Sequence, residues 1–519
     1  MICFMIGLSQ MRVWVCALLT AVSAVGARLE LTIVSGAGPV PARVHVCDAA
    51  GQSYLPEGTV AVPVGPDRWF ASDGQVRLDV PAGVVRVHVE RGPEYQPVRE
   101  DIRVSDVARR KITLRRWIDM RARGYTSGEN HLHVPAADLG AMLAAEDLDF
   151  GNSLHWWNDK RLLLPSAAHP VMTLSFAGHA APTTIFDAEV ENAWGAVYLT
   201  GLKRPMPIPW NRARSNLPYV RLAREQGALI SYQGGWSREV LLDALLGLVD
   251  VVNICNNNFH RFNYQPRTQY SNLLDAPGFP QYPNTPEGMM RMNTDTWYRL
   301  LNCGLRLAAG AESATGAKAT PAGYNRAYVR TGANSTLEQF LGAWRQGRNF
   351  VTNGPMVLLN ADGGREPGDT IALPAGGGTV RLDARALSDD PLRSLEIVVN
   401  GKVAGRAMGT ELVVAVKIRE GAWIAARATA EDRLLSDQEM QRFQREGKNV
   451  PAEAPCRLRF GHTSPIYVTV GGTGVRVAQS LAEARQMLEA FERWARNNAE
   501  PGYLREVLDA CIEARRALE

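Results

Sequence analysis

The chain has little of the features that identify several common classes of protein. Its 519 residues carry 57 Lys and Arg against 53 Asp and Glu, and the resulting net charge of +4 is too small for a nucleic-acid scaffold. Beyond the first residues, no apolar run approaches the roughly 20 residues that span a bilayer. We therefore expect no nucleic-acid partner and no transmembrane protein of the usual kind.

Cysteine is also sparse, and its spacing excludes two further classes of fold. Of seven Cys, Cys3 and Cys16 lie in the N-terminal segment and the other five are far apart along the chain. Neither a disulfide framework nor a zinc ribbon fits this spacing. The chain also lacks internal repeats, a low-complexity tract, a nucleophile elbow and a P-loop. The hydrophobic share of 46% instead predicts a folded protein of three or four structural units.

The N-terminal segment, residues 1–27, has the pattern of a secretory signal. Arg12 precedes the apolar run Val13–Val22, and small residues follow at Ser23–Ala27. This pattern predicts export to the periplasm or the extracellular space, with the mature chain beginning near Arg28. Three alternatives stay open: Met11 is the true start, the segment stays uncleaved as a membrane anchor, or it forms a buried strand.

Residues 28–118 alternate apolar and polar side chains in short runs, with Gly and Pro between them. The run Val84-Val-Arg-Val-His-Val89 is one example. A period of two with such punctuation predicts a small antiparallel β-sandwich. The order of these runs, including Pro39-Val-Pro-Ala-Arg-Val44, resembles the transthyretin-like or carboxypeptidase-regulatory-like modules of secreted proteins.

The rest of the chain divides into three stretches. In residues 119–358, strand-like runs alternate with helical ones, which predicts parallel strands joined by crossovers in an open sheet or a barrel. Residues 359–474 return to short strands with Gly-rich turns, which predicts a second β-sandwich. In residues 475–519, apolar residues recur at spacings of three and four on both sides of Pro501, which predicts a helical hairpin.

The strongest local signal for chemistry is a pair of histidines two residues apart. They close the run Gly124-Tyr-Thr-Ser-Gly-Glu-Asn-His131-Leu-His133. Side chains two residues apart in a strand project to the same side, so both imidazoles can face one ion. A third histidine, His155, follows about twenty residues later after the next strand-like run, where loops at one barrel mouth would converge.

Longer motifs carry a resemblance to a known family across residues 120–358. They include Asp187-Ala-Glu-Val-Glu-Asn-Ala-Trp-Gly-Ala196, Gly323-Tyr-Asn-Arg-Ala-Tyr-Val-Arg330 and Asn349-Phe-Val-Thr-Asn-Gly-Pro355. The stretch resembles the CehA/McbA branch of the PHP-type (polymerase and histidinol phosphatase) metallohydrolases. Known members hydrolyse aryl carbamate or ester bonds, and the wider superfamily cleaves phosphoesters. The resemblance implies a distorted PHP-like (β/α) barrel between the two sandwiches.

The resemblance also implies a set of metal ligands. His131 and His133 match the opening metal pair of the family, and His155 matches a further ligand, although Ser and Leu replace the Thr and Asp that usually precede it. Glu189 matches a carboxylate ligand, with Glu191 as the alternative if the register differs by two. The implied cofactor is a divalent ion such as zinc, manganese or iron.

One further ligand is implied, and two family positions are changed. Glu312 stands where the family has a shorter Asp, whereas Ala196 and Gly234 stand where it usually has His. Neither Ala nor Gly has a side chain that can bind metal. His260 is a candidate substitute or a surface residue, and we assign proton transfer to His155 or His260.

Two functions of different classes follow from these residues. The first is an exported metal-dependent hydrolase that activates water on a divalent ion to cleave an ester, carbamate or phosphoester bond in a small molecule. The alternative is a degenerate, non-catalytic PHP-like binding protein of the cell envelope, because two His positions are lost. Flanking sandwiches suit envelope or polysaccharide attachment in either case.

Overall fold

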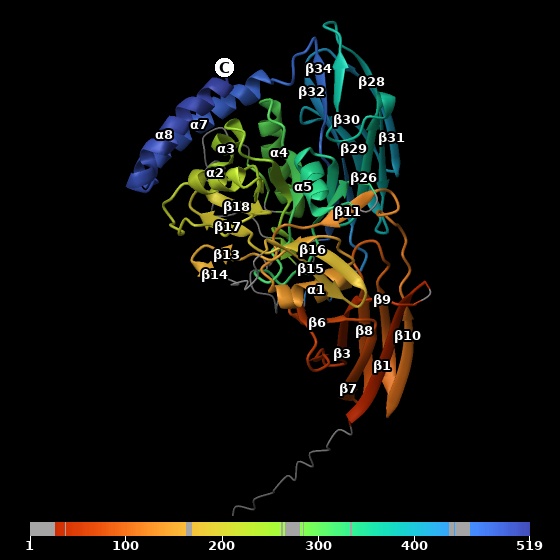
Figure 1. Ribbon diagram of the computed structural model, residues 1–519. Coiled ribbons are helices and arrows are strands. Elements are labelled where there is room, and N and C mark those ends of the chain that lie inside the picture. The colour runs from red at the N-terminus through yellow and green to blue at the C-terminus, as the bar shows by residue number, and fades with distance from the viewer. Residues whose placement is uncertain are drawn as a thin grey trace, which may run out of the picture.

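The computed structural model describes residues 26–519 except 37, 162–168, 261–262, 265–280, 284, 333–334, 435–437, 439–440 and 442–456. Within these residues the chain is a multidomain α/β and β protein, mostly strands with seven helices (Figure 1). None of the described helices is both long and apolar enough to cross a membrane. The predicted signal segment lies outside the described residues, apart from Gly26 and Ala27 at the start of β1.

The N-terminal unit contains two β-sheets around one apolar core. One sheet is formed by β1 (Gly26–Ser35), β2 (Gly38–Pro39), β7 (Gln75–Pro81) and β10 (Val107–Thr113). The other is formed by β3 (Ala42–Asp48), β4 (Ser53–Tyr54), β5 (Ala61–Val64), β6 (Asp67–Ser72), β8 (Gly83–Glu90) and β9 (Val98–Val104). Alternate residues of β1, such as Leu29, Leu31 and Ile33, are buried, as the period of two predicts.

The expectation of a purely antiparallel sandwich is wrong at one ladder, because β1 and β10 run parallel. The short connection after β9 carries the chain from one sheet into the other. Strand β10 pairs with the edge of β1 that does not pair with β7, and β10 and β1 run in the same direction.

The middle unit contains a seven-stranded sheet in the order β14-β13-β17-β18-β19-β20-β23. Its strands are β13 (Trp156–Trp157), β14 (Lys160–Arg161), β17 (Ala188–Asn192), β18 (Gly195–Thr200), β19 (Leu229–Tyr232), β20 (Val251–Cys255) and β23 (Ala308–Ala311). Its helices are α1 (Ala136–Ala145), α2 (Leu217–Glu225), α3 (Val240–Leu245), α4 (Pro286–Asn302) and α5 (Leu337–Arg345). A smaller sheet joins β12 (Gly151–Asn152), β15 (Val171–Phe176) and β16 (His179–Thr184), and β21 (Phe259–His260) pairs with β22 (Asn263–Tyr264).

Parallel strands joined by crossovers were expected here, and the sheet is in fact mixed. The ladders β13–β17, β19–β20 and β20–β23 are parallel, whereas β17, β18 and β19 are antiparallel neighbours. The chain turns from β17 into β18 through Ala193 and Trp194, with Gly195 at φ +133°. So short a turn can join only antiparallel strands.

A nine-stranded sheet crosses the boundary that the sequence predicted at residues 358 and 359. It contains β11 (Tyr125–Gly128), β24 (Arg326–Arg330), β25 (Asn349–Thr352), β27 (Thr370–Leu373), β29 (Leu392–Val399), β30 (Lys402–Ala407), β32 (Ala422–Glu431), β33 (Leu458–Thr463) and β34 (Ile466–Val470). The antiparallel pairing of β25 with β33 joins the middle unit to the C-terminal one. A three-stranded sheet is formed by β26 (Met356–Ala361), β28 (Gly378–Leu387) and β31 (Glu411–Ile418). It packs against the C-terminal strands of the nine-stranded sheet around a shared apolar core.

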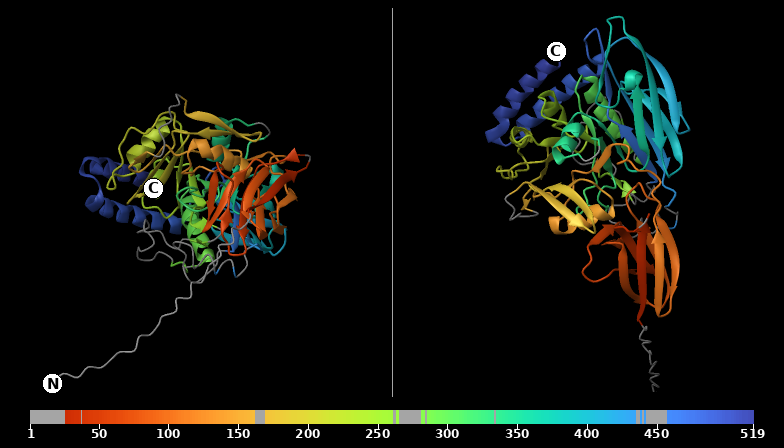
Figure 2. Two further views of the ribbon diagram at one scale, coloured as in Figure 1. Left: turned by 90° about the horizontal axis from the view of Figure 1, so that it is seen from below. Right: turned by 45° about the vertical axis from the view of Figure 1, so that its right-hand side comes forward.

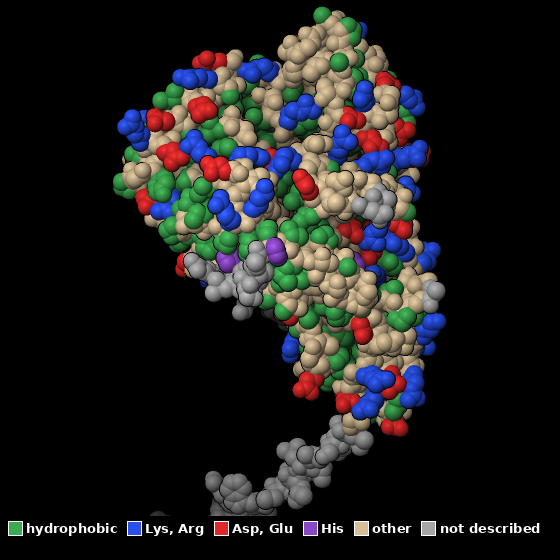
Figure 3. Space-filling model, in the orientation of Figure 1, with side chains coloured by type: hydrophobic (Ala, Val, Ile, Leu, Met, Phe, Trp, Pro, Cys, Tyr) green, Lys and Arg blue, Asp and Glu red, His purple; other side chains and the backbone are tan. Residues whose placement is uncertain are grey.

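The C-terminal helical hairpin is present as predicted. It consists of α7 (Ala478–Asn498) and α8 (Pro501–Ala517), and Pro501 occupies the first turn of α8. Phe491 and Trp494 place their rings edge-on to Trp194 in the middle unit. The two sandwiches lie on one side of the middle unit and the hairpin on the other (Figures 1 and 2). Acidic and basic side chains are interspersed over the face shown in Figure 3, consistent with the small net charge.

Candidate metal centre

The two histidines of the His-x-His pair lie on an extended segment that follows β11. Leu132 between them forms a bridge to Thr315, and the backbone nitrogen of His133 donates to the carbonyl of Thr315 at 2.8 Å. In this conformation both imidazoles project to the same side, and their Nε2 atoms are 2.9 Å apart. The convergence predicted from the two-residue spacing is confirmed.

Glu189 on β17 brings a carboxylate to the same point. Its Oε2 lies 3.1 Å from Nε2 of His131 and 3.1 Å from Nε2 of His133. Glu191, the alternative register, instead accepts a hydrogen bond from Trp157 Nε1 at 3.2 Å. His131, His133 and Glu189 therefore form a group that could hold a metal ion.

Glu312 was predicted to be a metal ligand, but its carboxylate does not lie beside these three donor atoms. It follows β23, and its Oε2 lies 2.7 Å from Nδ1 of His131, while its Oε1 accepts from the backbone nitrogen of Asn257 at 2.8 Å. Nδ1 and Nε2 lie on opposite sides of an imidazole ring. A carboxylate at Nδ1 is therefore placed behind His131, where it can orient the ring.

The electrostatics of the group favour a bound cation. Burial alone would lower the pKa of His131, but Glu189 and Glu312 outweigh it and raise this pKa to about 10. Burial would likewise raise the pKa of Glu189, but His131 and His133 lower it to about 2. In the absence of an ion the two carboxylates thus hold a proton on His131, and a divalent ion would replace that positive charge.

The geometry and chemistry of the donors fit a transition metal. Two imidazole nitrogens and one carboxylate oxygen are ligand types of zinc and related ions. At metal–ligand bonds of roughly 2.0–2.1 Å, two ligands of a tetrahedral ion are about 3.3 Å apart, close to the observed 2.9 and 3.1 Å. With Nδ1 of His131 donating to Glu312, its Nε2 presents a lone pair to the ion.

Aromatic rings pack around the two histidines. The ring of Tyr198, which pairs with Glu189 across the β17–β18 ladder, lies 4.0 Å from that of His131. The half-buried ring of Trp157 lies edge-on to His133 at 4.6 Å, and the Lys160 ammonium lies 4.7 Å above Trp157. Trp157 therefore borders the centre, whereas Trp236 is fully buried.

His155 does not join the group, contrary to the prediction. Its backbone nitrogen donates to the carbonyl of Asp187 at 2.8 Å, and its ring lies edge-on to Phe186 at 6.3 Å. The backbone pairing of this segment with the region before β17 sets that direction. His260 ends β21, and its side chain falls outside the part of the chain that the structure describes.

The two positions without histidine are closed by packing. Ala196 is buried on β18 opposite Glu191. At Gly234, an added Cβ would lie 2.3 Å from Nε1 of Trp236, which donates to Asn293 at 2.8 Å. The indole of Trp236 thus fills the space that a side chain at Gly234 would need.

Sequence reasoning missed Glu129, two residues before His131. Its carboxylate is fully buried and accepts from the backbone nitrogens of Ser313 and Gly323. Burial raises the pKa of Glu129 to about 8, although these two donors oppose the shift. The residue ties the segment after Glu312 to the segment that carries the His-x-His pair. Its place within the Gly-Glu-Asn-His run was the available signal.

The comparisons with known proteins add no relative. No family model, no curated protein and no solved structure matches the chain.

Proposed function

We propose that the chain is an exported, metal-dependent hydrolase of the CehA/McbA type. The observation that carries this proposal is the convergence of Nε2 of His131, Nε2 of His133 and Oε2 of Glu189 to within 3.1 Å of one another. Structural zinc sites have four protein ligands, whereas catalytic sites have three and leave one position for water or substrate. Three donors in this group support the catalytic type.

Each residue of the centre has a role in this proposal. His131, His133 and Glu189 would hold a divalent ion such as zinc, manganese or iron. Such an ion, when bound, lowers the pKa of water and polarises a carbonyl or phosphoryl oxygen. Glu312 keeps the ring of His131 in place, and Trp157 with Lys160 forms a flat, cationic border that suits an aromatic or anionic part of a small-molecule substrate.

Substrate class and location are part of the same proposal. The resemblance of residues 120–358 to carbamate, ester and phosphoester hydrolases supports those three bond types, and the residues from Arg12 to Ala27 support export. The two flanking sandwiches support attachment to the envelope or to polysaccharide.

A non-catalytic binding protein is the second candidate, and one observation favours it. The family usually has a histidine at position 234. This chain has Gly there, and Trp236 fills the space that a side chain would need. A protein of this kind would hold its ion or ligand without turnover.

Turnover separates the two candidates. The purified full chain, supplied with Zn²⁺, Mn²⁺ or Fe²⁺, is assayed on aryl ester, aryl carbamate and phosphoester substrates beside His131→Ala/His133→Ala and Glu191→Gln. The hydrolase predicts metal-dependent turnover of one class that the double variant loses and Glu191→Gln retains. A chain that binds metal but hydrolyses no substrate of the three classes supports the binding protein.

A further inference from the structure

A hollow in the surface lies between the start of β23, the end of α5 and strand β34. It is lined by Arg306, Ala308, residues 345–348, Gly368 and Tyr467. Its volume is about 290 Å³, close to the lower limit of the roughly 300–1,000 Å³ that small-molecule pockets usually have. The hollow therefore has room for a small ligand.

Three arginines line the hollow, and two of them have no anionic partner. Arg306 and Arg348 are exposed and form no ion pair with a described residue. Arg345 lies 3.3 Å from Oδ1 of Asp250, but Arg224 already lies 2.9 Å from the same oxygen. No Asp or Glu among the described residues lines the hollow itself. Its positive charge is therefore largely unbalanced.

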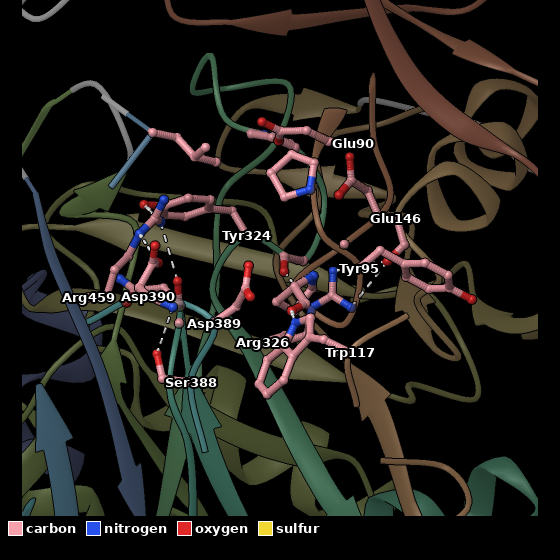
Figure 4. Close-up of a pocket in the computed structure, with 18 of the residues that line it drawn as sticks. Glu90, Tyr95, Trp117, Glu146, Tyr324, Arg326, Ser388, Asp389, Asp390 and Arg459 are labelled. Atoms are coloured by element: carbon pink, nitrogen blue, oxygen red, sulfur yellow. Dashed lines mark hydrogen bonds and ion pairs between the residues drawn. The ribbon is translucent and has the colours of Figure 1, made fainter. Parts of the chain in front are cut away.

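The arginines in the cavity where the two sandwiches meet the middle unit differ from these (Figure 4). Arg43 pairs with Glu90 at 2.5 Å, and Arg326 donates to the backbone carbonyl of Glu146 at 3.2 Å. That cavity has a volume of only about 110 Å³. Its arginines hold parts of the chain together, whereas Arg306 and Arg348 pair with no carboxylate.

Arg306 is held in position beside the hollow. Its guanidinium lies 4.1 Å from the centroid of the Tyr467 ring, and its Nη2 donates to Oγ1 of Thr370 at 2.9 Å. A guanidinium has five N–H donors, so most of them remain available to a ligand. A side chain that is already ordered loses less entropy when a ligand binds.

The end of α5 does not account for these arginines. The carbonyls of Ala343 and Trp344 in its last turn accept from the backbone nitrogens of Arg348 and Gly347, at 3.0 and 2.8 Å. Basic side chains also stabilise the C-terminus of a helix through its dipole. That effect applies to residues of the helix end, whereas Arg306 precedes β23.

We propose that this hollow binds the phosphate group of a small molecule. Guanidinium groups form paired hydrogen bonds with phosphate oxygens. A phosphate monoester carries up to two negative charges and three free oxygens, so it can contact more than one arginine at once. Arg306 and Arg348 donate to its oxygens, and Arg345 adds positive charge beside them.

The hollow and the candidate metal centre lie at opposite ends of β23. Ala308 begins this strand and lines the hollow, whereas Glu312 follows the strand and contacts His131. At about 3.3 Å per residue these two positions are roughly 13 Å apart. The two sites share no residue, so the proposal does not depend on the hydrolase.

The test titrates the full chain by calorimetry with inorganic phosphate, glucose 6-phosphate and glucose, at about 0.1 M salt so that exposed charges are screened. At least one of the two phosphate compounds should bind with a millimolar or lower Kd, and glucose should not bind. Arg348→Gln and Arg306→Gln should each weaken the binding tenfold or more. Arg68→Gln is the matched control, because Arg68 on β6 is exposed and also forms no ion pair with a described residue.

A second control separates the hollow from the candidate metal centre, which could itself attract phosphate through a bound ion. The variant His131→Ala/His133→Ala should bind the phosphate compound as tightly as the wild type. Three results would overturn the proposal: neither phosphate compound binds, Arg68→Gln weakens binding as much as Arg348→Gln, or the double histidine variant loses binding that Arg348→Gln retains. Thermal melting of each ligand-free variant confirms its fold, and Arg348→Gln should melt like the wild type because its side chain is exposed.

Discussion

Glu189 and Glu312 are both buried beside His131, but they face opposite nitrogens of its ring. Glu189 lies on the side of Nε2, with the other converging donor atoms, whereas Glu312 contacts Nδ1. A carboxylate that accepts the Nδ1 proton fixes the tautomer and orientation of a ligand histidine and makes it a stronger base. Glu312 would therefore act on a bound ion through His131.

Replacing Glu312 by Gln should weaken metal affinity by about tenfold or more, because an amide is a poorer acceptor for the Nδ1 proton. Glu312→Asp should also weaken it, since the shorter side chain cannot reach both Nδ1 of His131 and the nitrogen of Asn257. Competition with a chromogenic chelator measures the affinity, with Glu191→Gln as the matched control. Equal metal affinity in the wild type, both Glu312 variants and Glu191→Gln would show that Glu312 does not support metal binding through His131.

Gly234→Ala should destabilise the chain by about 1–3 kcal/mol, the usual cost of overpacking a filled core. The new methyl group would collide with the indole of Trp236, which Asn293 holds by a hydrogen bond. Gly342→Ala in α5 is the control, since nothing lies within 4 Å of a Cβ there and alanine favours a helix. Chemical denaturation compares the two. A loss of stability no greater at Gly234 than at Gly342 would show that the space is open.

His462 should make the fold sensitive to acid. Burial lowers its pKa to about 3, against an ordinary 6.5 when unfolded. The unfolded chain thus binds more protons between these values, so the stability present above pH 6.5 falls as the pH drops towards 3. At pH 5 the loss is about 2 kcal/mol. Chemical denaturation at pH 7.5 and pH 5 should show a smaller loss of unfolding free energy for His462→Gln than for the wild type. An equal loss in the two proteins would contradict this role of His462.

The residues predicted correctly from the sequence are those fixed by local geometry. The two-residue spacing of His131 and His133 sets their common direction in any extended segment. Glu189 was proposed only through the resemblance to the metallohydrolase family, and its carboxylate lies beside both histidines. Which nitrogen of His131 a carboxylate faces depends on the meeting of β23 with a distant segment, so the position of Glu312 at Nδ1 could not be predicted from sequence. The direction of His155 likewise depends on its pairing with Asp187.

The end of α1 is held by arginines of the N-terminal sandwich. Arg43 contacts Glu90 and Glu146, and Arg91 donates to the carbonyl of Ala144 and to Asp147, both at 2.7 Å. These contacts join the sandwich to the helix that follows the His-x-His pair. No sequence pattern indicated these contacts, because residues 43 and 146 meet only in the folded chain.

Arg43→Met should lower the free energy of unfolding by about 3–5 kcal/mol, because Glu90 and Glu146 would stay buried after losing the arginine that pairs with both of them. Arg86→Met in the same sandwich removes an ion pair to Asp101 whose side chains are 63% and 55% exposed, and should cost about 1 kcal/mol or less. Denaturant midpoints of the first unfolding transition compare them. Similar losses in both variants would mean that the buried pairs contribute no more than a surface pair.

Across the molecule, the units predicted from changes in sequence texture are less separate than their boundaries suggest. The change near residue 358 is real in composition, but β26 runs through it and β25 pairs with β33 beyond it. Strand pairing between distant segments leaves no local pattern, whereas the hairpin of α7 and α8 was predictable from its period and Pro501. The position of the candidate metal centre next to this shared sheet could not be inferred from sequence.

The metal content of the purified full chain tests the central claim most directly. After dialysis, mass spectrometry should find about one equivalent of a divalent transition metal per chain in the wild type and in Glu191→Gln. The double variant His131→Ala/His133→Ala should hold less than about a tenth of an equivalent while keeping the wild-type circular dichroism spectrum. An unchanged stoichiometry in the folded double variant, or a wild-type chain that takes up no metal, would contradict the account.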